Sequence, residues 1–581
     1  MSIFDYSSED AIGSVYSVDT GTVLVAVSNS DELRRMQVNH LVVLRSSRAG
    51  QHLIGLVNKI MRKALVRMDH DDDTAVEMHD DPSVVENIVR ITLIGTFLDA
   101  VGTARNVFRR TLETVPEIDA QCFVLSGDRL TQFMRAISKP VVEGQEPLSL
   151  GKYTLDQDAD AWVDGNRFFQ RHAVIVGSTG SGKSWTVARV LEQVAKLPNS
   201  SALLFDIHGE YEPLEGEGIC RLKVAGPGDL ATGPTLADGV LFLPYWLLTY
   251  EEMLAMLLDR SDQNAPNQAM LFNREVLSAK RSYLEAEDKV DVLANFTIDS
   301  PIPYSLNDVL AKLMEWDTEM VPGAKGEKQG PYHGKLTRFI QRLQSKVEDR
   351  RLGFLFGAGD DAMRYEWMAE LAVALLGSTA IRGHGGVKVI DFSEVPSDIL
   401  PLIIGLVARV VFTVQQWTEP GRRHPVALFC DEAHLYIPDQ REGGVAEEGL
   451  KSFERIAKEG RKYGVGLIVI SQRPSEVNRT VLSQCNNFLA MRLTNAEDQN
   501  VIRRLLPDTL GGFAELLPIL DIGEALIVGD AAVLPSRIRV EEPNRRPASA
   551  TVNFWDRWAL KQLENGIPTA VEALRKQRTG G

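Results

Sequence analysis

The sequence contains little cysteine and no long uncharged apolar run. Its four cysteines, spread over 581 residues, show neither paired metal-ligand spacing nor the disulfide framework of a small secreted domain. No uncharged apolar segment approaches the ~20 residues that cross a bilayer, and the first residues lack a basic stretch followed by an apolar one. These absences lead us to expect a cytoplasmic protein with reduced cysteines.

The sequence also has fewer basic residues than acidic ones. Lys and Arg total 63 against 79 Asp and Glu, which gives a formal net charge of -16. This balance argues against a protein coated with basic surface for nucleic acid, but it leaves room for a basic channel inside an assembly. The apolar share of 44% and the charged share of 24% are typical of a soluble globular protein. The length predicts about three to four domains.

Short alternating runs occupy the chain from about Gly13 to Ala100, such as "GSVYSVDTGTVLVAVS" and "NHLVVLRSS". Because Gly, Asn, Asp and Ser separate these runs, they predict a small β-barrel over residues 1–100. The acidic run "MDHDDDTAVEMHDD" interrupts this pattern, and we interpret it as a solvated loop, with a metal site as the alternative. Residues 101–165 are less patterned and are expected to connect the barrel to the next domain.

From about Arg171 onward, apolar β-rich runs alternate with helical patterns: "AVIVG", "ALLFD", "VKVIDF", "VALFCDE", "VGLIVIS" and "NFLAMRL". Runs that are apolar on both faces predict a mostly parallel sheet covered by helices, so the fold class is α/β. We assign residues 166–247 and 368–550 to two parts of this domain. Residues 248–367 are mainly helical and charged and are expected to form an insertion. Residues 551–581 form a helical tail suited to packing on a neighbour.

The stretch "GSTGSGKS", Gly177 to Ser184, matches the phosphate-binding pattern G-x-x-x-x-G-K-[ST] between an apolar strand and a helix. Its glycines let backbone amides close around an anion, and the helix N-terminus adds a favourable dipole. Lys183 is expected to reach the β- and γ-phosphates and Ser184 to offer its hydroxyl to Mg²⁺. The predicted nucleotide-binding residues are Ser178, Thr179, Gly180, Ser181, Gly182, Lys183, Ser184 and Trp185.

A second segment, "HPVALFCDEAHLYIP", delivers Asp431 and Glu432 at the end of an apolar strand. Phosphoryl transfer depends mainly on positioning and charge stabilisation, so the two acids are expected to do separate work. Asp431 is predicted to hold Mg²⁺ through water. Glu432 is predicted to orient or deprotonate the attacking water.

A third segment, "FERIAKEGRKYGVGLIVISQRPSEV", predicts a helix ending near Gly464, then a strand, then polar residues. Gln472 at the strand end is placed to report on the γ-phosphate. Arg461 on the helix is expected to reach a neighbouring subunit's nucleotide, whereas Arg455 is better explained by a surface ion pair. The buried stripe of this helix is predicted to contain Leu450, Phe453, Ile456 and Ala457.

A fourth segment, "LLFDIHGEYEP", places His208 between Asp206 and Glu210. A metal site is one interpretation of these residue types. The favoured alternative is a compact turn near the nucleotide in which side chains hydrogen-bond the backbone.

Together, "GSTGSGKS", "DIHGEY", "LFCDEAH", "EGRKYGVGL" and "SQRPSEV" resemble the HerA branch of the HerA/FtsK superfamily of hexameric DNA-translocating ATPases. The N-terminal barrel is similar to the HAS-barrel of HerA proteins. The resemblance implies a RecA-like core, a homo-hexameric ring with ATP and Mg²⁺ at subunit interfaces, and double-stranded DNA in the central pore. It implies Lys183, Glu432, Gln472 and Arg461 as catalytic residues, Ser184 and Asp431 as metal ligands, and Arg171 as a further arginine of the same subunit.

The resemblance also implies a partner, either a nuclease of the NurA type or a defence effector such as a sirtuin-like NADase or a nuclease. The long insertion and the acidic balance depart from the family's pattern. They keep open a second hypothesis, in which the ring is an ATP-dependent scaffold that assembles and regulates the effector without pumping DNA. A third, a secretion or conjugation ATPase, is disfavoured by the missing membrane anchor.

Overall fold

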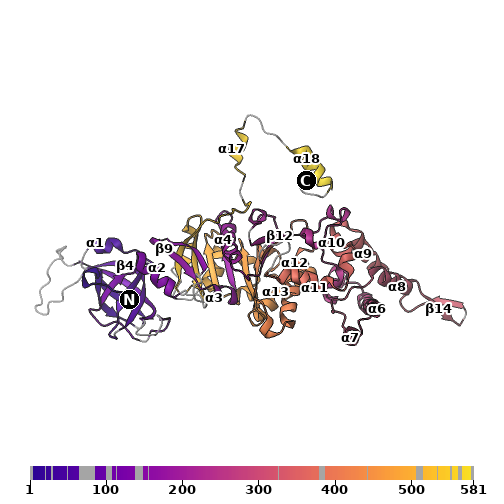
Figure 1. The fold of residues 1–581 in the computed structure, drawn as a ribbon, viewed down its shortest axis with the longest axis horizontal. Coiled ribbons are helices and arrows are strands. Elements are labelled where there is room, and N and C mark those ends of the chain that lie inside the picture. Colours follow the sequence, from indigo (N-terminus) through magenta and orange to yellow (C-terminus); the bar gives the residue numbers. More distant parts are fainter. Residues whose placement is uncertain are drawn as a thin grey trace, which may run out of the picture. The chain divides into compact units, whose positions relative to one another are not determined.

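The computed structural model separates into two compact units. Figure 1 shows its helices and strands, coloured along the sequence. Unit 1 comprises Met1–Phe168, Ser178–Gly182 and Asn487–Glu541, and unit 2 comprises Phe169–Gly177, Lys183–Asn486 and Glu542–Gly581. The structure describes residues 4–19, 21–27, 30–48, 50–64, 85–99, 107–112, 114–137, 148–154, 156–216, 218–324, 326–378, 386–440, 443–505, 514–532, 534–549, 552–560 and 566–576. The acidic run at 68–81, interpreted above as a loop, lies outside these residues.

Unit 1 begins with a closed six-stranded barrel, which confirms the predicted small β-barrel. The strands follow the order β2-β1-β7-β3-β4-β5, and β2 pairs with β5 to close the barrel. Alternate residues of β2, namely Val23, Val25 and Val27, are buried in its core. Its strands are β1 (Gly13–Val18), β2 (Thr22–Val27), β3 (Leu41–Arg45), β4 (Gln51–Ala64), β5 (Val85–Leu98) and β7 (Gln121–Val124), with α1 (Ser30–Arg35) beside them and β6 (Val107–Arg109) on β5.

The remainder of unit 1 contains antiparallel strands in the order β19-β20-β21-β8-β9. These are β8 (Leu148–Tyr153), β9 (Asp156–Val163), β19 (Asn487–Met491), β20 (Glu524–Gly529) and β21 (Ser536–Val540), and the helices nearby are α2 (Gly127–Ile137), α3 (Gly165–Gln170) and α15 (Ala496–Leu505). The run "NFLAMRL", expected in the parallel sheet, forms β19 and pairs antiparallel with β20. Residues 101–165, expected to be a connection, supply β6, β7, β8 and β9. Two of these strands have partners far away in the sequence: β7 pairs with β1 and β3, and β8 pairs with β21.

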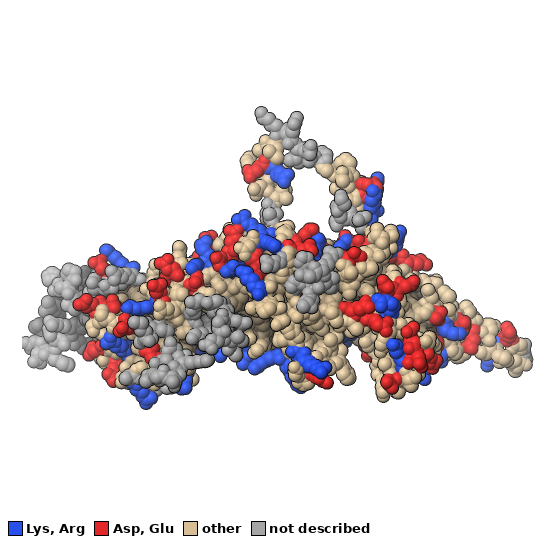
Figure 2. All heavy atoms as spheres, in the orientation of Figure 1, with Lys and Arg blue, Asp and Glu red and all other residues tan. Residues whose placement is uncertain are grey.

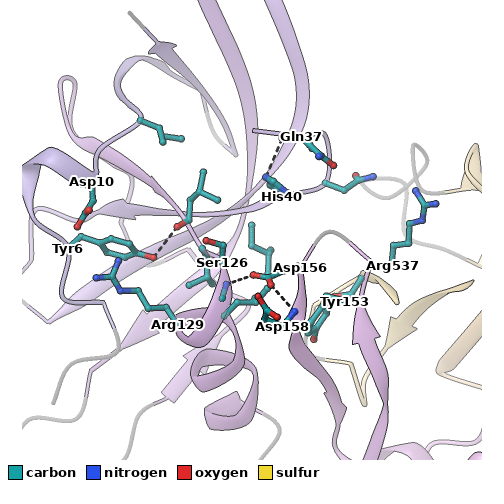
Figure 3. Close-up of a pocket in the computed structure, with 18 of the residues that line it drawn as sticks. Tyr6, Asp10, Gln37, His40, Ser126, Arg129, Tyr153, Asp156, Asp158 and Arg537 are labelled. Carbon is teal, nitrogen blue, oxygen red and sulfur yellow. Dashed lines mark hydrogen bonds between the residues drawn. The ribbon is translucent and has the colours of Figure 1, made fainter. Parts of the chain in front are cut away.

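A cavity of about 720 Å³ lies within unit 1, between the barrel and strands β9 and β21 (Figure 3). Several of the polar side chains that line it already have partners within the protein. Asp156 accepts hydrogen bonds from the backbone amides of Gly127 and Asp158, and the Arg129 guanidinium lies 4.3 Å from the centre of the Tyr6 ring. Burial lowers the pKa of His40, which also lines the cavity.

Unit 2 contains a seven-stranded sheet in which every pairing is parallel, in the order β13-β12-β16-β11-β17-β18-β10. The strands are β10 (Ala173–Val176), β11 (Ala202–Asp206), β12 (Ile219–Val224), β13 (Val240–Leu241), β16 (Val387–Asp391), β17 (Val426–Cys430) and β18 (Val465–Ser471). All residues of β10, β11, β16, β17 and β18 are buried, as continuous apolar runs predict for strands covered on both faces. The predicted parallel core is thereby confirmed.

Helices α4 (Lys183–Ala195), α12 (Leu400–Trp417) and α13 (Gly444–Tyr463) belong to this core. Among the described residues, α12 is the one helix with a length and composition suited to crossing a bilayer, and 67% of it is buried inside the protein. The predicted stripe of α13 is confirmed, since Leu450, Phe453, Ile456 and Ala457 are all buried.

The segment expected as an insertion, residues 248–367, contains α5 (Tyr250–Leu257), α6 (Ala265–Ala286), α7 (Val290–Leu293), α8 (Leu306–Thr318), α9 (Thr337–Glu348) and α10 (Gly353–Phe356), and α11 (Trp367–Leu376) begins at its last residue. It also carries a β-hairpin of β14 (Met320–Gly323) and β15 (Gly326–Gln329). The buried Glu252 of α5 receives two hydrogen bonds from Arg409 of α12, at 2.8 and 2.7 Å, and this charge-assisted pair fixes the segment on the core. The remaining helices are α14 (Arg479–Ser483), α17 (Phe554–Trp558) and α18 (Ile567–Lys576).

Candidate functional site

The carboxyl ends of four neighbouring parallel strands carry most of the polar residues singled out above. β10 leads into the glycine-rich loop, β11 ends at Asp206, β17 is followed by Asp431, and β18 is followed by Gln472. Because these strands are adjacent in the order β11-β17-β18-β10, their carboxyl ends lie at one edge of the sheet. Ligands of open α/β sheets bind at this edge.

The glycine-rich loop joins β10 directly to α4. The amide of Ser181 donates to the carbonyl oxygen of Ser178 at 3.1 Å, which closes a turn. Gly180 and Gly182 have φ values of 75° and 109°, conformations that strain other residues. The Ser181 hydroxyl is buried without a hydrogen-bond partner among the described residues. Since a buried hydroxyl ordinarily has a partner, the loop has the form of a cradle that a phosphate would complete.

The first turn of α4 carries Lys183, Ser184 and Trp185. Lys183 is buried, and its positive charge opposes the rise in the pKa of Asp431. The Ser184 hydroxyl donates to Glu210 Oε2 at 3.3 Å. Sequence reasoning considered Glu210 only within a turn or a metal site and did not pair it with Ser184.

Asp431 and Glu432 follow β17 as predicted. Burial, and then the neighbouring Glu432 carboxylate, raise the pKa of Asp431 to about 8. Asp431 is buried beside a second carboxylate, so a bound cation would stabilise the charged form of the pair. Carboxylate oxygens are ligands that Mg²⁺ accepts. The residues therefore fit a Mg²⁺-nucleotide.

Glu432 lies in the left-handed region, with φ 45° and ψ 43°. Its amide donates to Asp431 Oδ1 at 3.0 Å, so the two acids share one tight bend. The Tyr436 hydroxyl donates to the Asp431 carbonyl oxygen at 2.9 Å and so stabilises this bend. The two carboxylates are thus fixed by backbone geometry rather than by a flexible loop.

His434 is a site residue that sequence reasoning missed. Its Nδ1 lies 3.4 Å from Glu432 Oε2 and 3.3 Å from the Ser471 hydroxyl, and burial lowers its pKa. Ser471 ends β18 and directly precedes Gln472, so His434 links the two predicted catalytic segments. The available signal was its place in "CDEAH", immediately after the predicted acids.

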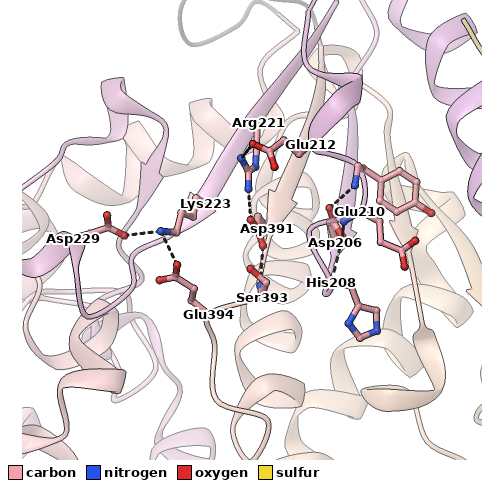
Figure 4. Close-up of polar contacts among 11 residues, drawn as sticks. Asp206, His208, Glu210, Glu212, Arg221, Lys223, Asp229, Asp391, Ser393 and Glu394 are labelled. Atoms are coloured by element: carbon pink, nitrogen blue, oxygen red, sulfur yellow. Dashed lines mark hydrogen bonds and ion pairs between the residues drawn. The ribbon is translucent and has the colours of Figure 1, made fainter. Parts of the chain in front are cut away.

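The turn "DIHGEY" has the compact form that was favoured over a metal site (Figure 4). Asp206 accepts hydrogen bonds from the amides of His208, Glu210 and Tyr211 at 3.3, 3.1 and 2.9 Å. Burial raises the pKa of Asp206 to about 6, and the amides of Tyr211 and Glu210 oppose the rise. Asp206 therefore organises the turn that presents Glu210 to Ser184.

Arg461 and Arg455 occupy the exposed side of α13. Arg455 is engaged within its own chain: it donates to Gln416 Oε1 at 3.1 Å, and its guanidinium lies 5.0 Å from the centre of the Phe412 ring. The Arg461 side chain has no hydrogen bond or ion pair to any described residue. Arg171 lies two residues before the first residue of β10, and its carbonyl oxygen accepts from the Asn486 amide at 2.9 Å.

Comparison with known proteins finds similarity to a protein family over the central part of the chain and to curated relatives over about two thirds of it. Residues 148–411 match the family model described as the central domain of helicase HerA. A probable helicase of Methanocaldococcus jannaschii is 25% identical over 423 residues, which cover 72% of this chain and 71% of the relative. The DNA double-strand break repair helicase HerA of Pyrococcus furiosus is 24% identical, over 69% of this chain and 70% of the relative. Among solved structures, VirB4 of Thermoanaerobacter pseudethanolicus has a TM-score of 0.44 at 17% identity, over 70% of this chain and 99% of that chain.

Proposed function

We propose that the chain is a HerA-type ATPase that uses ATP hydrolysis to drive double-stranded DNA through a ring of six copies; its similarity to the HerA central domain over residues 148–411 and to HerA helicases supports this. The observation that carries this proposal is the cluster of Lys183, Asp431 and Glu432 at the carboxyl edge of the parallel sheet. The DNA substrate is proposed from the relatives, several of which are named as DNA double-strand break repair helicases.

In this proposal, residues 178–184 hold the phosphates, with Lys183 on the β- and γ-phosphates. Ser184 and Asp431 would hold Mg²⁺, which would neutralise part of the phosphate charge when bound. Ser184 would keep its hydrogen bond to Glu210, because a hydroxyl can donate its proton to a carboxylate while an oxygen lone pair faces a cation. Glu432 positions and deprotonates the attacking water, and Gln472 responds to the γ-phosphate.

Arg461 completes the site from the neighbouring subunit in this proposal. Its exposed guanidinium, without a partner among the described residues, is available to a second copy of the chain. We also propose that the ring works with a partner, a nuclease of the NurA type or a defence effector. The chain itself shows no nuclease constellation in its sequence, so DNA cleavage would come from that partner.

The test measures ATP hydrolysis by the purified full-length chain with and without linear duplex DNA, together with displacement of a triplex-forming strand from that DNA. We expect DNA to raise turnover several-fold and the strand to be displaced only with ATP. Lys183→Ala should abolish both signals. ATP turnover that is indifferent to DNA, without strand displacement, would refute translocation and support the scaffold hypothesis, in which a partner protein stimulates the ATPase.

A further inference from the structure

Residues 542–549, here called the C-terminal strap, run along the P-loop helix after the last strand of unit 1. The carboxylate of Glu192 on α4 is buried and accepts three hydrogen bonds from the strap. Two come from the amide and the side chain of Asn544, both at 3.0 Å, and one comes from the Arg545 amide at 2.8 Å. A buried carboxylate with three donors is a specific anchor, so the strap has one register on α4.

Further contacts fix the strap beside the "DIHGEY" turn. Arg545 donates to the carbonyl oxygens of Leu214 and Glu215 at 3.0 and 2.7 Å. A side chain at Gly216 would collide with this guanidinium, since a Cβ would lie 1.8 Å from Arg545 Nη1. The Ala548 amide donates to the Glu210 carbonyl oxygen at 2.7 Å. The strap is thus attached to the same residue that receives the Ser184 hydroxyl.

Between these anchors, the Arg546 guanidinium lies over the Trp185 ring. The guanidinium carbon lies 5.2 Å from the centre of the Trp185 ring, and the indole is 37% exposed. Trp185 directly follows Lys183 and Ser184, so its ring stands next to the residues proposed to hold the phosphates. An exposed indole with a planar cation on it is a stacking platform for a flat ligand.

We propose that Trp185 and Arg546 together form the nucleobase subsite of the ATPase, with the strap supplying Arg546. This inference rests on the proposed nucleotide use of the P-loop and adds the part of the ligand that the P-loop does not bind. The phosphates are held by backbone amides and Lys183, which are indifferent to the base. Trp185 and Arg546 offer a stacking surface and hydrogen-bond donors only, so they recognise a planar ring without selecting one purine.

The test compares three ligands by isothermal titration calorimetry of the full-length protein with Mg²⁺: ATP, GTP and inorganic tripolyphosphate. In the wild type, both nucleotides should bind at least about tenfold more tightly than tripolyphosphate, and within several-fold of each other. Trp185→Ala and Arg546→Ala should each weaken ATP and GTP by about three- to tenfold. Their affinity for tripolyphosphate should stay at the wild-type value.

Matched controls are Trp417→Ala and Arg422→Ala, which remove an exposed indole and an exposed guanidinium elsewhere in unit 2. Neither should change any of the three affinities. Arg546→Met keeps the length of the side chain and should behave as Arg546→Ala does, which separates stacking by the guanidinium from packing of its stem.

Three results would overturn the proposal. Equal loss of affinity for tripolyphosphate would show that the strap only supports the P-loop. Unchanged ATP and GTP affinity in both alanine variants would place the base elsewhere. A wild type that binds ATP no more tightly than tripolyphosphate would have no base subsite. Failure of the DNA-translocation proposal is distinguishable, because it would abolish the effect of DNA on turnover and leave these affinities as expected.

Discussion

At the scale of single residues, Glu432 stands out because its backbone is strained. It adopts φ 45° and ψ 43° although it has a Cβ, a conformation that costs on the order of 1–3 kcal/mol and tends to persist at functional sites. The hydrogen bond from its amide to Asp431 Oδ1 supports the bend. Because the backbone holds the carboxylate, replacing the side chain by its amide should alter the chemistry and leave the bend in place.

Glu432→Gln is therefore expected to bind ATP within about threefold of the wild-type affinity and to hydrolyse it about 100- to 10,000-fold more slowly, the usual contribution of a general base. Nucleotide binding by calorimetry and phosphate release measure the two effects. Glu419→Gln, which alters an exposed glutamate paired with Arg422, should leave both unchanged. Wild-type turnover in Glu432→Gln would move the base to another residue.

His172 is a buried residue whose role is structural and depends on pH. Its Nδ1 accepts from the Leu467 amide at 2.9 Å and its Nε2 lies 3.1 Å from the Ala457 carbonyl oxygen, an arrangement that requires the neutral ring. Burial lowers its pKa from 6.5 to about 4. Between these values the unfolded chain binds a proton that the folded chain does not, so the stability from neutral His172 is present above pH 6.5 and falls as the pH drops toward 4.

We expect His172→Asn to lower the thermal unfolding midpoint at pH 7.5, and the gap to the wild type to narrow at pH 5. Asparagine tolerates the positive φ of 53° found at this position, so the substitution tests the ring and not the backbone. His208→Asn, at an exposed position, should leave the midpoint unchanged at both pH values. A gap that widens as the pH falls would contradict a neutral buried ring.

At the scale of elements, α12 and α13 approach each other through two glycines. A Cβ on Gly405 of α12 would lie 2.6 Å from the Gly449 Cα, and a Cβ on Gly449 of α13 would lie 2.1 Å from the Pro401 carbonyl oxygen. Gly449→Ala must push the helices apart and should destabilise the protein by about 1–3 kcal/mol, measured by denaturant unfolding. Gly421→Ala, whose new methyl group meets nothing within 4 Å, is the matched control. Equal stability of the two variants would refute close packing at this crossing.

The sequence predicted those elements whose signals are local. The strands around "GSTGSGKS" and "LFCDEAH" and the buried stripe of α13 were correct, because apolar runs and helical spacing act within a few residues. The strap, β8 and β9 were not foreseen. Asn544 bonds Glu192, which lies 352 residues earlier, and β8 pairs with β21, which lies near the far end of the chain. Pairing over such distances leaves no periodicity in either segment.

At the scale of the whole molecule, acidic residues outnumber basic ones, 79 to 63. Figure 2 shows acidic and basic side chains interspersed over the face in view, and the formal net charge is -16. A ring of such chains would gain its affinity for DNA from residues concentrated at the pore rather than from overall attraction. The proposed translocation should therefore depend on how subunits meet, which is tested most directly through Arg461.

If Arg461 reaches the nucleotide of a neighbouring subunit, Arg461→Ala should bind ATP normally and hydrolyse it on the order of 10³- to 10⁵-fold more slowly, as expected for an arginine finger. Arg455→Ala is the matched control on the same helix, because Arg455 is engaged within its own chain by Gln416 and Phe412. It should keep near-wild-type turnover, since exposed pairs contribute under about 1 kcal/mol.

The same residue tests the ring itself, because Lys183 and Arg461 would serve one active site from two different chains. Neither Arg461→Ala nor Lys183→Ala should be active alone. Mixed rings should recover part of the activity, since an interface between one chain of each kind can combine an intact Lys183 with an intact Arg461. Phosphate release from mixtures, with co-assembly verified by pull-down of one tagged chain, measures this recovery. Co-assembled mixtures no more active than either variant would show that Arg461 acts within its own chain or only supports the fold.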